Sequence, residues 1–287
     1  MLSTISSAFI QSPMLFVSFC MLIGLIIGSF LNVVIYRLPK MMELAWQESC
    51  REPSQQSTSP HATYNLFQPK SACPHCQHAI GFLENIPVLS YVFLGGRCHH
   101  CKQPISIRYP MIEVASGLLV GLIAWHFGYS IDTLGASVFV LALLTLTCID
   151  LETQLLPDII TLPLLWAGLI FNFNTGFTGL QSAVIGAIAG YLILWTVYWA
   201  FKLITKKEGM GHGDFKMLAA IGAWLGWQMI PAVILLSSLS ASIVGLSLII
   251  FDEKKRSHAI PFGPYLALAG MIALFWHQSL TALFTGN

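Results

Sequence analysis

The side chain placed most favourably for chemistry is Asp214. It lies in the glycine-rich sequence Gly-Met-Gly-His-Gly-Asp-Phe-Lys at residues 209–216, between two long apolar segments. A carboxylate at the point where a chain re-enters a membrane is energetically costly, which makes it a candidate functional residue. Because Gly211 and Gly213 have no side chains, we expect clearance beside Asp214 for an extended substrate backbone. The stretch therefore predicts a functional acid that another backbone could approach closely.

A second acid, Asp150, directly follows an apolar segment at about residues 133–149. An acid at the end of a helix meets the negative end of the helix dipole, which is unfavourable, so we expect Asp150 to have a function. Two carboxyl groups within hydrogen-bonding reach cannot easily both ionise, and they share a proton. One carboxylate could then deprotonate an attacking water while the protonated partner polarises a scissile carbonyl. The pair predicts aspartic protease chemistry, although a proton relay in a transporter would use the same two acids.

Two further acids near apolar segments have structural interpretations. Asp158 follows Pro157 at the start of the next apolar segment, and this pair is typical of a helix start with a capping residue. Glu113 lies in the first turns of another apolar segment, where we expect an anchoring hydrogen bond in preference to catalysis. Both residues, together with Lys216, are predicted to support the site.

Four of the seven cysteines form two C-x-x-C pairs, Cys73/Cys76 and Cys98/Cys101, separated by 21 residues. This spacing is typical of zinc knuckles, in which thiolates bind Zn²⁺ tetrahedrally. Four ligands leave no open position, so the sequence predicts a structural zinc site that supplies most of the folding energy of a polar loop. The neighbouring His75, His99 and His100 could replace a ligand. Because no basic and aromatic run accompanies the pairs, we expect no nucleic-acid partner.

The elements that must position these residues are membrane spans. Hydrophobic residues make up 55% of the 287 residues and charged residues only 9%, whereas soluble domains have about 25% charged residues. A span needs about 20 apolar residues, and about eight segments qualify: 14–35, 110–127, 133–149, 159–174, 178–201, 215–230, 232–251 and 261–283. The first basic residue is Arg37, so we expect the first segment to be a retained span, not a cleaved leader. The sixth and seventh nearly touch at Pro231, which predicts a tight turn there.

The charges orient these segments. All 14 Lys and Arg residues lie in or beside residues 37–109, 202–216 and 252–258, which alternation of eight spans places on one side. The positive-inside rule makes that side cytoplasmic and puts both termini outside. Asp150 and Asp214 then lie at the same cytoplasmic depth. We therefore predict an all-α polytopic membrane protein with about eight transmembrane helices and a cytoplasmic zinc-binding loop between the first and second.

This organisation predicts three regions: a first transmembrane span at 1–36, a cytoplasmic loop with the four-cysteine zinc site at 37–109, and a seven-helix transmembrane peptidase domain at 110–287. Residues 51–60 are rich in Ser, Gln and Pro, which is typical of a flexible insertion. The lipid bilayer is an expected partner of these helices.

The motifs together resemble a known family. The sequence Gly-His-Gly-Asp at 211–214 fits the GxGD signature of membrane aspartic proteases. With Lys216, the stretch 149–158 and the two C-x-x-C pairs, the chain resembles type IV prepilin peptidases along nearly its full length. Further segments similar to that family are 28–39, 108–110 and Pro-Phe-Gly-Pro-Tyr at 261–265.

The resemblance implies a bifunctional enzyme of the bacterial inner membrane. Such enzymes cleave the basic leader of type IV prepilins or type II secretion pseudopilins after a glycine, and then N-methylate the new N-terminal residue, usually Phe, with S-adenosylmethionine. It implies that Asp150 and Asp214 are catalytic and that the four cysteines bind zinc. Leader residues could meet nearby acids such as Glu152, Asp158 and Glu208, unless these acids pair with Lys206, Lys207 or Lys216.

The methyl-donor site and the alternative function are not decided by the residues. No strand followed by G-x-G-x-x-G supports a Rossmann-type site for the methyl donor, so methylation rests on the resemblance alone. The alternative function is a proton-coupled membrane transporter. It would more often show broken helices with polar residues at mid-membrane, whereas these acids are predicted at the interface.

Overall fold

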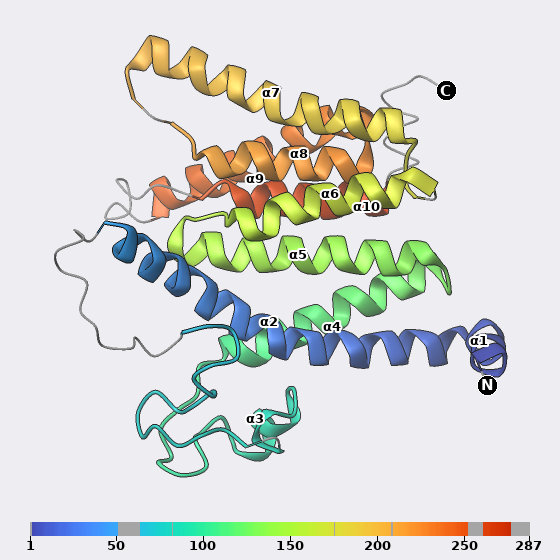
Figure 1. Cartoon of the computed structure of the whole chain (residues 1–287), viewed down its shortest axis with the longest axis vertical. Coiled ribbons are helices and arrows are strands. Elements are labelled where there is room, and N and C mark those ends of the chain that lie inside the picture. The colour runs from blue at the N-terminus through green and yellow to red at the C-terminus, as the bar shows by residue number, and fades with distance from the viewer. Residues whose placement is uncertain are drawn as a thin grey trace. The chain divides into compact units, whose positions relative to one another are not determined.

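The computed structural model describes residues 2–50, 64–81, 83–174, 176–207, 209–251 and 261–276. Within these residues the regular elements are all helices, and the only β-pairing consists of isolated bridges in the cysteine loop. The all-helical prediction is therefore confirmed (Figure 1). The predicted insertion at 51–60 and the end of the eighth predicted segment lie outside the described residues. The chain divides into two compact units, residues 1–129 and 130–287.

The first unit contains α1 (Leu2–Gln11), α2 (Pro13–Ser49), the short helix η2 (Leu83–Asn85), α3 (Leu89–Phe93) and α4 (Arg108–Phe127). Helices α2 and α4 pack closely at Gly28, where a Cβ would lie 2.8 Å from the Cα of Glu113. The Asn32 side chain also donates to the Tyr109 carbonyl over 3.1 Å. These contacts fix the register of α2 on α4.

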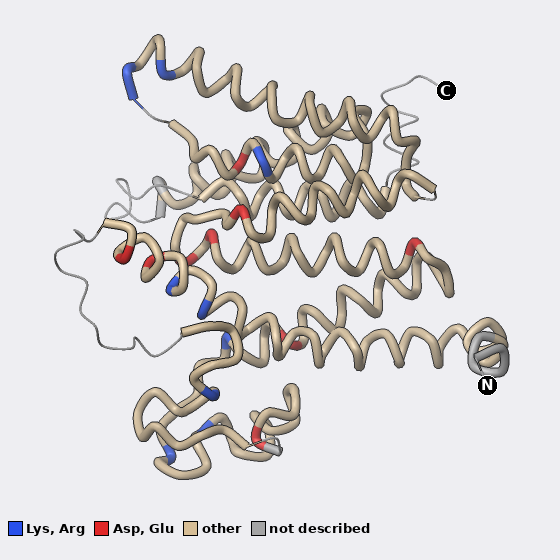
Figure 2. Tube along the Cα trace, viewed as in Figure 1, with Lys and Arg blue, Asp and Glu red and all other residues tan. Residues whose placement is uncertain are grey.

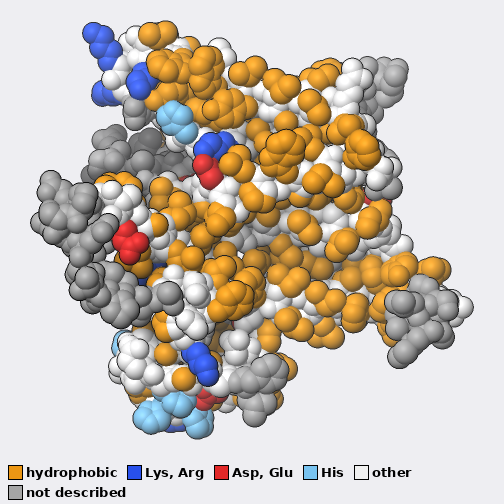
Figure 3. Space-filling model, viewed as in Figure 1, with side chains coloured by type: hydrophobic (Ala, Val, Ile, Leu, Met, Phe, Trp, Pro, Cys, Tyr) orange, Lys and Arg blue, Asp and Glu red, His pale blue; other side chains and the backbone are white. Residues whose placement is uncertain are grey.

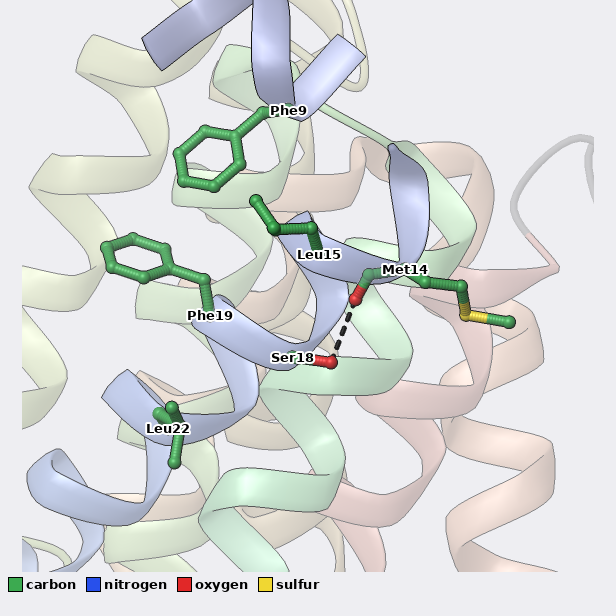
Figure 4. A pocket seen from close by; sticks show the side chains of 6 residues that line it. All are labelled: Phe9, Met14, Leu15, Ser18, Phe19 and Leu22. Atoms are coloured by element: carbon green, nitrogen blue, oxygen red, sulfur yellow. Dashed lines mark hydrogen bonds between the residues drawn. The ribbon is translucent and has the colours of Figure 1, made fainter. Parts of the chain in front are cut away.

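The corner between α1 and α2 is apolar. Phe9 packs its ring 5.4 Å from that of Phe16 and 5.2 Å from that of Phe19. Figure 4 shows the shallow hollow beside this corner, which is lined by Phe9, Met14, Leu15, Ser18, Phe19 and Leu22. Its one hydroxyl, on Ser18, donates to the Met14 carbonyl within the helix. The hollow therefore offers no group for chemistry.

Helix α2 is longer than the predicted segment 14–35. Its 37 residues extend to Ser49, which is about 55 Å at 1.5 Å per residue. Pro39 lies inside it, where a proline removes one hydrogen bond and kinks a helix. Figure 1 shows α2 changing direction in its second half. The helix thus continues past the apolar segment into the polar part of the chain.

The second unit contains α5 (Ile131–Thr153), α6 (Asp158–Asn174), α7 (Leu180–Thr205), α8 (His212–Leu225), the short helix η3 (Trp227–Met229), α9 (Ile230–Phe251) and α10 (Gly263–Phe275). Its core is α8, which is buried along almost its whole length and packs against α6, α7 and α10. Trp224 donates to the Leu164 carbonyl over 2.8 Å, and the Asn172 amide donates to the Ala223 carbonyl over 2.8 Å. Helix α8 is therefore held from several sides.

The turn after α8 differs from the prediction. Helix α8 ends at Leu225, and Gly226 follows with a φ of 85°, a conformation that favours glycine. The turn therefore occupies residues 226–229, so the predicted tight turn is present but lies before Pro231 and not at it. Pro231 lies in the first turn of α9, where the proline nitrogen has no helical partner to lose.

Five helices are long and apolar enough to cross a membrane, within Pro13–Ser49, Arg108–Phe127, Ile131–Thr153, Leu180–Thr205 and Trp227–Leu248. Shorter apolar helices occupy Asp158–Asn174 and Gly263–Phe275. Hydrophobic side chains cover much of the face seen in Figure 3. In the second unit, the basic residues that the structure describes gather at the end of α7 and the start of α8 (Figure 2). The chain is a multi-pass membrane protein.

Candidate active site and metal centre

Asp150 lies near the C-terminal end of α5 and is only 4% exposed. Its Oδ2 accepts a hydrogen bond of 3.0 Å from the backbone N–H of Gly263, the first residue of α10. The first N–H groups of a helix have no partner within the helix, and the helix dipole favours a negative charge there. The start of α10 therefore compensates the unfavourable position of Asp150 at the end of α5.

Asp214 lies in the first turn of α8 and is 6% exposed. The preceding Gly211 is the N-cap of this helix, and its carbonyl accepts the Asp214 N–H at 3.3 Å. A carboxylate in the first turn of a helix is favoured by the dipole. The charge of Asp150 also acts on Asp214 across the site. The two acids predicted from the sequence thus lie in one buried neighbourhood at the ends of α5 and α8.

Leu156, in the connection between α5 and α6, packs against both neighbouring helix starts. A Cβ at Gly213 would lie 2.7 Å from the Leu156 Cβ, and a Cβ at Gly263 would lie 3.3 Å from its Cδ2. A Cβ at Gly263 would also approach Asp150 Oδ2 to 2.5 Å. The space beside Gly213 is therefore filled by Leu156 of the same chain, and the predicted clearance for a substrate backbone is wrong at this residue. The glycines instead allow three segments to meet around the acids.

Lys216 binds Asp158 on the outside of this arrangement. Its Nζ lies 2.7 Å from both carboxylate oxygens of Asp158, the first residue of α6. Lys216 is two positions after Asp214, which places the two side chains on different faces of α8. The ion pair joins the first turns of α6 and α8. Asp158 was predicted either to meet leader residues or to pair with a lysine, and the structure shows the pair with Lys216. Glu208, for which the same alternatives were given, lies outside the described residues.

An aromatic cluster borders the same turn of α8. The His212 ring lies 5.0 Å from that of Tyr198 and 5.4 Å from that of Phe215. Tyr198 belongs to α7, and its hydroxyl accepts a hydrogen bond of 3.2 Å from Lys202. These rings pack α7 against the start of α8. His212, which lies between Gly211 and Gly213 of the signature, is therefore part of this packing.

In the first unit the four predicted cysteine ligands come together. The sulfur atoms of Cys73, Cys76, Cys98 and Cys101 all lie within 4.8 Å of one another. Cys73 and Cys101 are 3.7 Å apart and Cys76 and Cys98 are 4.0 Å apart. A regular tetrahedron with metal–sulfur bonds of 2.3 Å has edges of about 3.8 Å. The cluster could therefore hold a metal ion, and the sulfurs are too far apart for disulfide bonds.

The two C-x-x-C turns are built alike. The Cys73 carbonyl accepts from Gln77 N–H over 2.9 Å, and the Cys98 carbonyl accepts from Lys102 N–H over 3.0 Å. Gln77 and Lys102 have almost the same φ, 59° and 60°. Each turn thus presents two sulfurs from one repeated backbone geometry, as the spacing predicted.

Backbone N–H groups prepare this cluster for a cation. Those of Cys76 and His75 point at the Cys73 sulfur and lower the pKa of its thiol to about 6. The N–H of Gln103 lowers the pKa of Cys101, but burial and the three neighbouring sulfurs outweigh it and raise that pKa to about 11. Four thiolates this close repel one another unless a cation lies between them, which is the chemistry of a metal site.

The histidines of the loop interact outside the cluster. Glu84 lies 3.7 Å from His78 and 3.7 Å from His99, and it accepts the Gly81 N–H over 3.0 Å. His100 stacks on His78 with ring centres 5.3 Å apart. These contacts join the histidines and Glu84 of the loop to one another.

Glu113 has the anchoring role that the sequence predicted. Its Oε2 accepts a hydrogen bond of 2.8 Å from the backbone N–H of Val88. The side chain is buried on α4, and the bond ties the segment before α3 to that helix.

Comparison with known proteins identifies the family of the chain. Residues 22–127 match the bacterial peptidase A24 N-terminal domain, and residues 137–246 match the type IV leader peptidase family. A prepilin leader peptidase/N-methyltransferase of Aeromonas hydrophila is 53% identical, over 96% of each chain. The chain belongs to the prepilin leader peptidase/N-methyltransferase family.

Other relatives of the same name are similarly close. The protein of Stutzerimonas stutzeri is 50% identical over 96% of this chain and 95% of its own length. The protein of Pseudomonas aeruginosa is 50% identical over 95% of this chain and 94% of its own length. No solved structure matches the chain. As a member of the prepilin leader peptidase/N-methyltransferase family, the chain is a bifunctional enzyme, and the resemblance inferred from its motifs is confirmed.

Sequence reasoning missed two contacts around the candidate acid pair. Gly263, whose N–H binds Asp150, lies in the segment 261–265 that carried part of the family resemblance, but its partner could not be identified from spacing. Leu156 lies in the stretch 149–158, which also carried part of the resemblance, and its contacts with Gly213 and Gly263 could not be identified from spacing either. Neither Gly263 nor Leu156 has a side chain that could mark it as a contact of the acids.

Proposed function

We propose that this chain cleaves the basic leader of type IV prepilins, or of type II secretion pseudopilins, after a glycine at the cytoplasmic face of the bacterial inner membrane. It then methylates the new N-terminal residue, usually Phe, with S-adenosylmethionine. The observation that carries the peptidase proposal is the pair of buried carboxyl groups, Asp150 and Asp214, in one neighbourhood of the second unit.

Each acid has a backbone N–H partner, Gly263 for Asp150 and Gly211 for Asp214, so the division of roles between them is part of the proposal. Asp150 accepts a backbone N–H at the start of α10, and such a donor favours the ionised carboxylate. We assign Asp150 as the base that takes a proton from the attacking water. Asp214 then holds the shared proton and polarises the scissile carbonyl. When the bond breaks, the proton on the base passes to the leaving amine.

We also propose a supporting role for residues around the acids. Gly211 caps the helix that carries Asp214, Gly213 admits Leu156, and the Lys216–Asp158 pair holds α8 to α6. Glu113 supports the cysteine loop of the first unit. None of these residues needs to touch the substrate in this proposal.

The topology proposal has eight spans, with both termini periplasmic and with the acids and the cysteine loop in the cytoplasm. The gathering of Lys202, Lys206 and Lys207 at the end of α7 supports it, because basic residues favour the cytoplasmic side. We keep the division into a first span at 1–36, a cytoplasmic loop at 37–109 and a seven-helix peptidase domain at 110–287. A prepilin's basic leader stays in the cytoplasm while its apolar helix lies in the lipid bilayer, so the scissile bond would reach the depth of the acids.

The cofactors proposed are a structural Zn²⁺ and the methyl donor. Cys73, Cys76, Cys98 and Cys101 would hold the zinc ion, since their sulfurs fit a tetrahedral site with no open position. The ion would stabilise the loop without taking part in the reaction. The name of the relatives supports a methyltransferase, and hence S-adenosylmethionine as the donor. The proposal includes no nucleic-acid partner.

Cleavage by the full chain in lipid nanodiscs tests the peptidase proposal. The substrate is a prepilin with a basic leader, and mass spectrometry follows leader removal. Asp150→Asn and Asp214→Asn should each abolish cleavage, whereas Asp132→Asn at the other end of α5 should not. Normal cleavage by either of the first two variants would show that the acids are not a catalytic pair.

The same assay with S-adenosylmethionine should add the mass of one methyl group to the mature product. An unmodified product would limit this chain to proteolysis. The transporter alternative predicts no cleavage by the wild-type chain, together with proton uptake that both Asn variants remove. The family name favours the peptidase.

A further inference from the structure

The segment at residues 85–96 has an unusual surface for part of a polar loop. It contains no Lys, Arg, His, Asp or Glu, and it carries α3. Leu89, Val92 and Phe93 of this helix are 54%, 67% and 84% exposed. Their spacing of three and four residues places them on one face. A helix on a water-facing surface normally has the opposite arrangement, with its apolar side inward.

The Tyr91 hydroxyl of α3 interacts within the loop. The Tyr91 hydroxyl donates to the Ile105 carbonyl at 3.5 Å. The ring end of Tyr91 lies against Gly96, where a Cβ would be 2.9 Å from the hydroxyl oxygen. The side chain that could face water is therefore used inside the loop, and the apolar side chains are turned outward.

The start of α3 is fixed at a defined depth along α4. Glu113, whose carboxylate accepts the Val88 N–H, is five residues after Arg108, the first residue of α4. At 1.5 Å per residue this is about 7–8 Å along the helix. Helix α4 has 20 residues and needs its full length to cross the hydrocarbon core. Val88 is thus held beside a part of α4 that lies within the membrane.

The backbone at Val88 shows that this position is imposed by the surroundings. Val88 has a φ of 60°, which β-branched residues rarely adopt. The hydrogen bond to Glu113 satisfies its N–H, and an unpaired N–H would be costly beside lipid. Figure 1 shows α3 next to the beginning of α4 in the first unit. The loop therefore turns back to the level of the bilayer before α4 begins.

We propose that α3 lies in the interfacial layer of the bilayer, with Leu89, Val92 and Phe93 inserted among the lipid chains. The uncharged segment is too short to cross the membrane, and it suits a helix that lies in the interface. Glu113 is the residue that positions it. The four-cysteine cluster is thereby docked on the membrane surface instead of extending into solution. The occupant of this apolar face is lipid because the Glu113 bond fixes the face at the depth of a membrane-spanning helix.

A nitroxide label on Phe93→Cys tests the proposal. Cys20, Cys50 and Cys148 are replaced by Ser, while the four clustered cysteines are kept with zinc bound. The full chain is placed in nanodiscs of phosphatidylcholine and phosphatidylglycerol. Electron paramagnetic resonance then compares collisions of the label with oxygen, which concentrates in lipid, and with a polar nickel complex. Gln103→Cys, exposed in the same loop, is the matched control.

The oxygen-to-nickel collision ratio at residue 93 should be several-fold higher than at residue 103. Equal ratios would place α3 in water, and a label shielded from both reagents would show that protein, such as a second copy, covers this face. Either result overturns the proposal. If Phe93→Cys loses its zinc, Val92→Cys provides the same measurement.

The role of Glu113 is tested on the same labelled chain. Glu113→Ala removes the acceptor for the Val88 N–H, so the ratio at residue 93 should fall toward the value of the Gln103 control. Glu113→Gln keeps an acceptor oxygen and should keep the high ratio. An unchanged ratio in Glu113→Ala would remove Glu113 as the positioning residue.

Discussion

Asp150 is held by Gly263, a residue 113 positions further along the chain, whereas Cys73 is held by Gln77 and His78, only four and five positions away. The acids come from helix ends that meet only after the second unit has packed around α8. The cysteines come from two short turns with the same backbone geometry. The acid site thus depends on the packing of apolar helices, and the cysteine site would depend on the metal ion that its four sulfurs could hold.

This difference determines what each site can tolerate. In the acid site, a side chain in the wrong place displaces a carboxylate but leaves most of the packed core intact. In the cysteine loop, few buried apolar side chains remain if the metal is removed. Changes in one unit should therefore produce a failure of a different kind from changes in the other.

The largest effect is expected from removing the metal. Cys98→Ser should lower the zinc content from about one ion per chain to a small fraction, because binding energies of structural zinc are on the order of 10 kcal/mol. Residues 70–105 should then become sensitive to limited proteolysis. Metal analysis and mapping of the cut sites measure both effects.

Cys148→Ser is the control, because Cys148 lies on α5 outside the cluster. It should keep both the zinc and the protease resistance. A Cys98→Ser variant with full zinc content would show that the cysteines are not the ligands.

The next largest effect concerns the acid pair. Asp214→Asn should reduce kcat for leader cleavage by roughly 10²–10⁴-fold, the contribution of acid–base catalysis. The double variant Asp150→Asn/Asp214→Asn should be no slower than either single variant, because residues that act as a unit are not additive. Single-turnover cleavage of a prepilin measures this. Strictly additive losses would contradict a shared role.

A smaller effect is expected at the contact that sequence reasoning missed. Gly263→Ala places a Cβ 2.5 Å from Asp150 Oδ2. Such overpacking costs about 1–3 kcal/mol, and it should lower both the stability and kcat while the zinc content is unchanged. Gly179→Ala is a matched control, since no atom lies within 4 Å of its Cβ position. Equal effects of the two variants would contradict the close approach of α10 to Asp150.

The smallest effect should come from the ion pair. Lys216→Met removes the 2.7 Å contact with Asp158, and partly exposed pairs contribute about 0–1 kcal/mol. We expect a small drop in Tm that shrinks at high salt, with cleavage only mildly reduced. Lys216→Arg should restore stability at low salt. A loss of cleavage as large as that of Asp214→Asn would mean that Lys216 acts in the chemistry.

The sequence predicted the residues with chemical side chains well. The four cysteines follow from a local spacing that fixes a local geometry, and Glu113 followed from its position in the first turns of an apolar helix. That Asp150 and Asp214 catalyse the reaction stays a prediction, although the structure places both in one buried neighbourhood. The long membrane helices could be predicted because their hydropathy is a direct property of the sequence.

The remaining features depend on contacts between distant segments. The partner of Asp150 is a backbone N–H, which no residue type reveals, and Leu156 looks like any apolar residue in a connection. The turn at Gly226 was misplaced to Pro231 because proline is also tolerated in the first turn of a helix. The extension of α2 to Ser49 was missed because Pro39 and the mixture of polar and apolar residues after it do not mark a membrane span.

The bond from Gly263 to Asp150 also bears on how the enzyme could be inhibited or could escape inhibition. Its donor is a main-chain N–H, a group that every residue except proline carries, so few single substitutions delete it. A compound that wedges α10 away from α5 would remove this donor without touching either acid. Resistance to such a compound would be hard to acquire at residue 263 itself, because any added side chain there disturbs the carboxyl group that the bond orients.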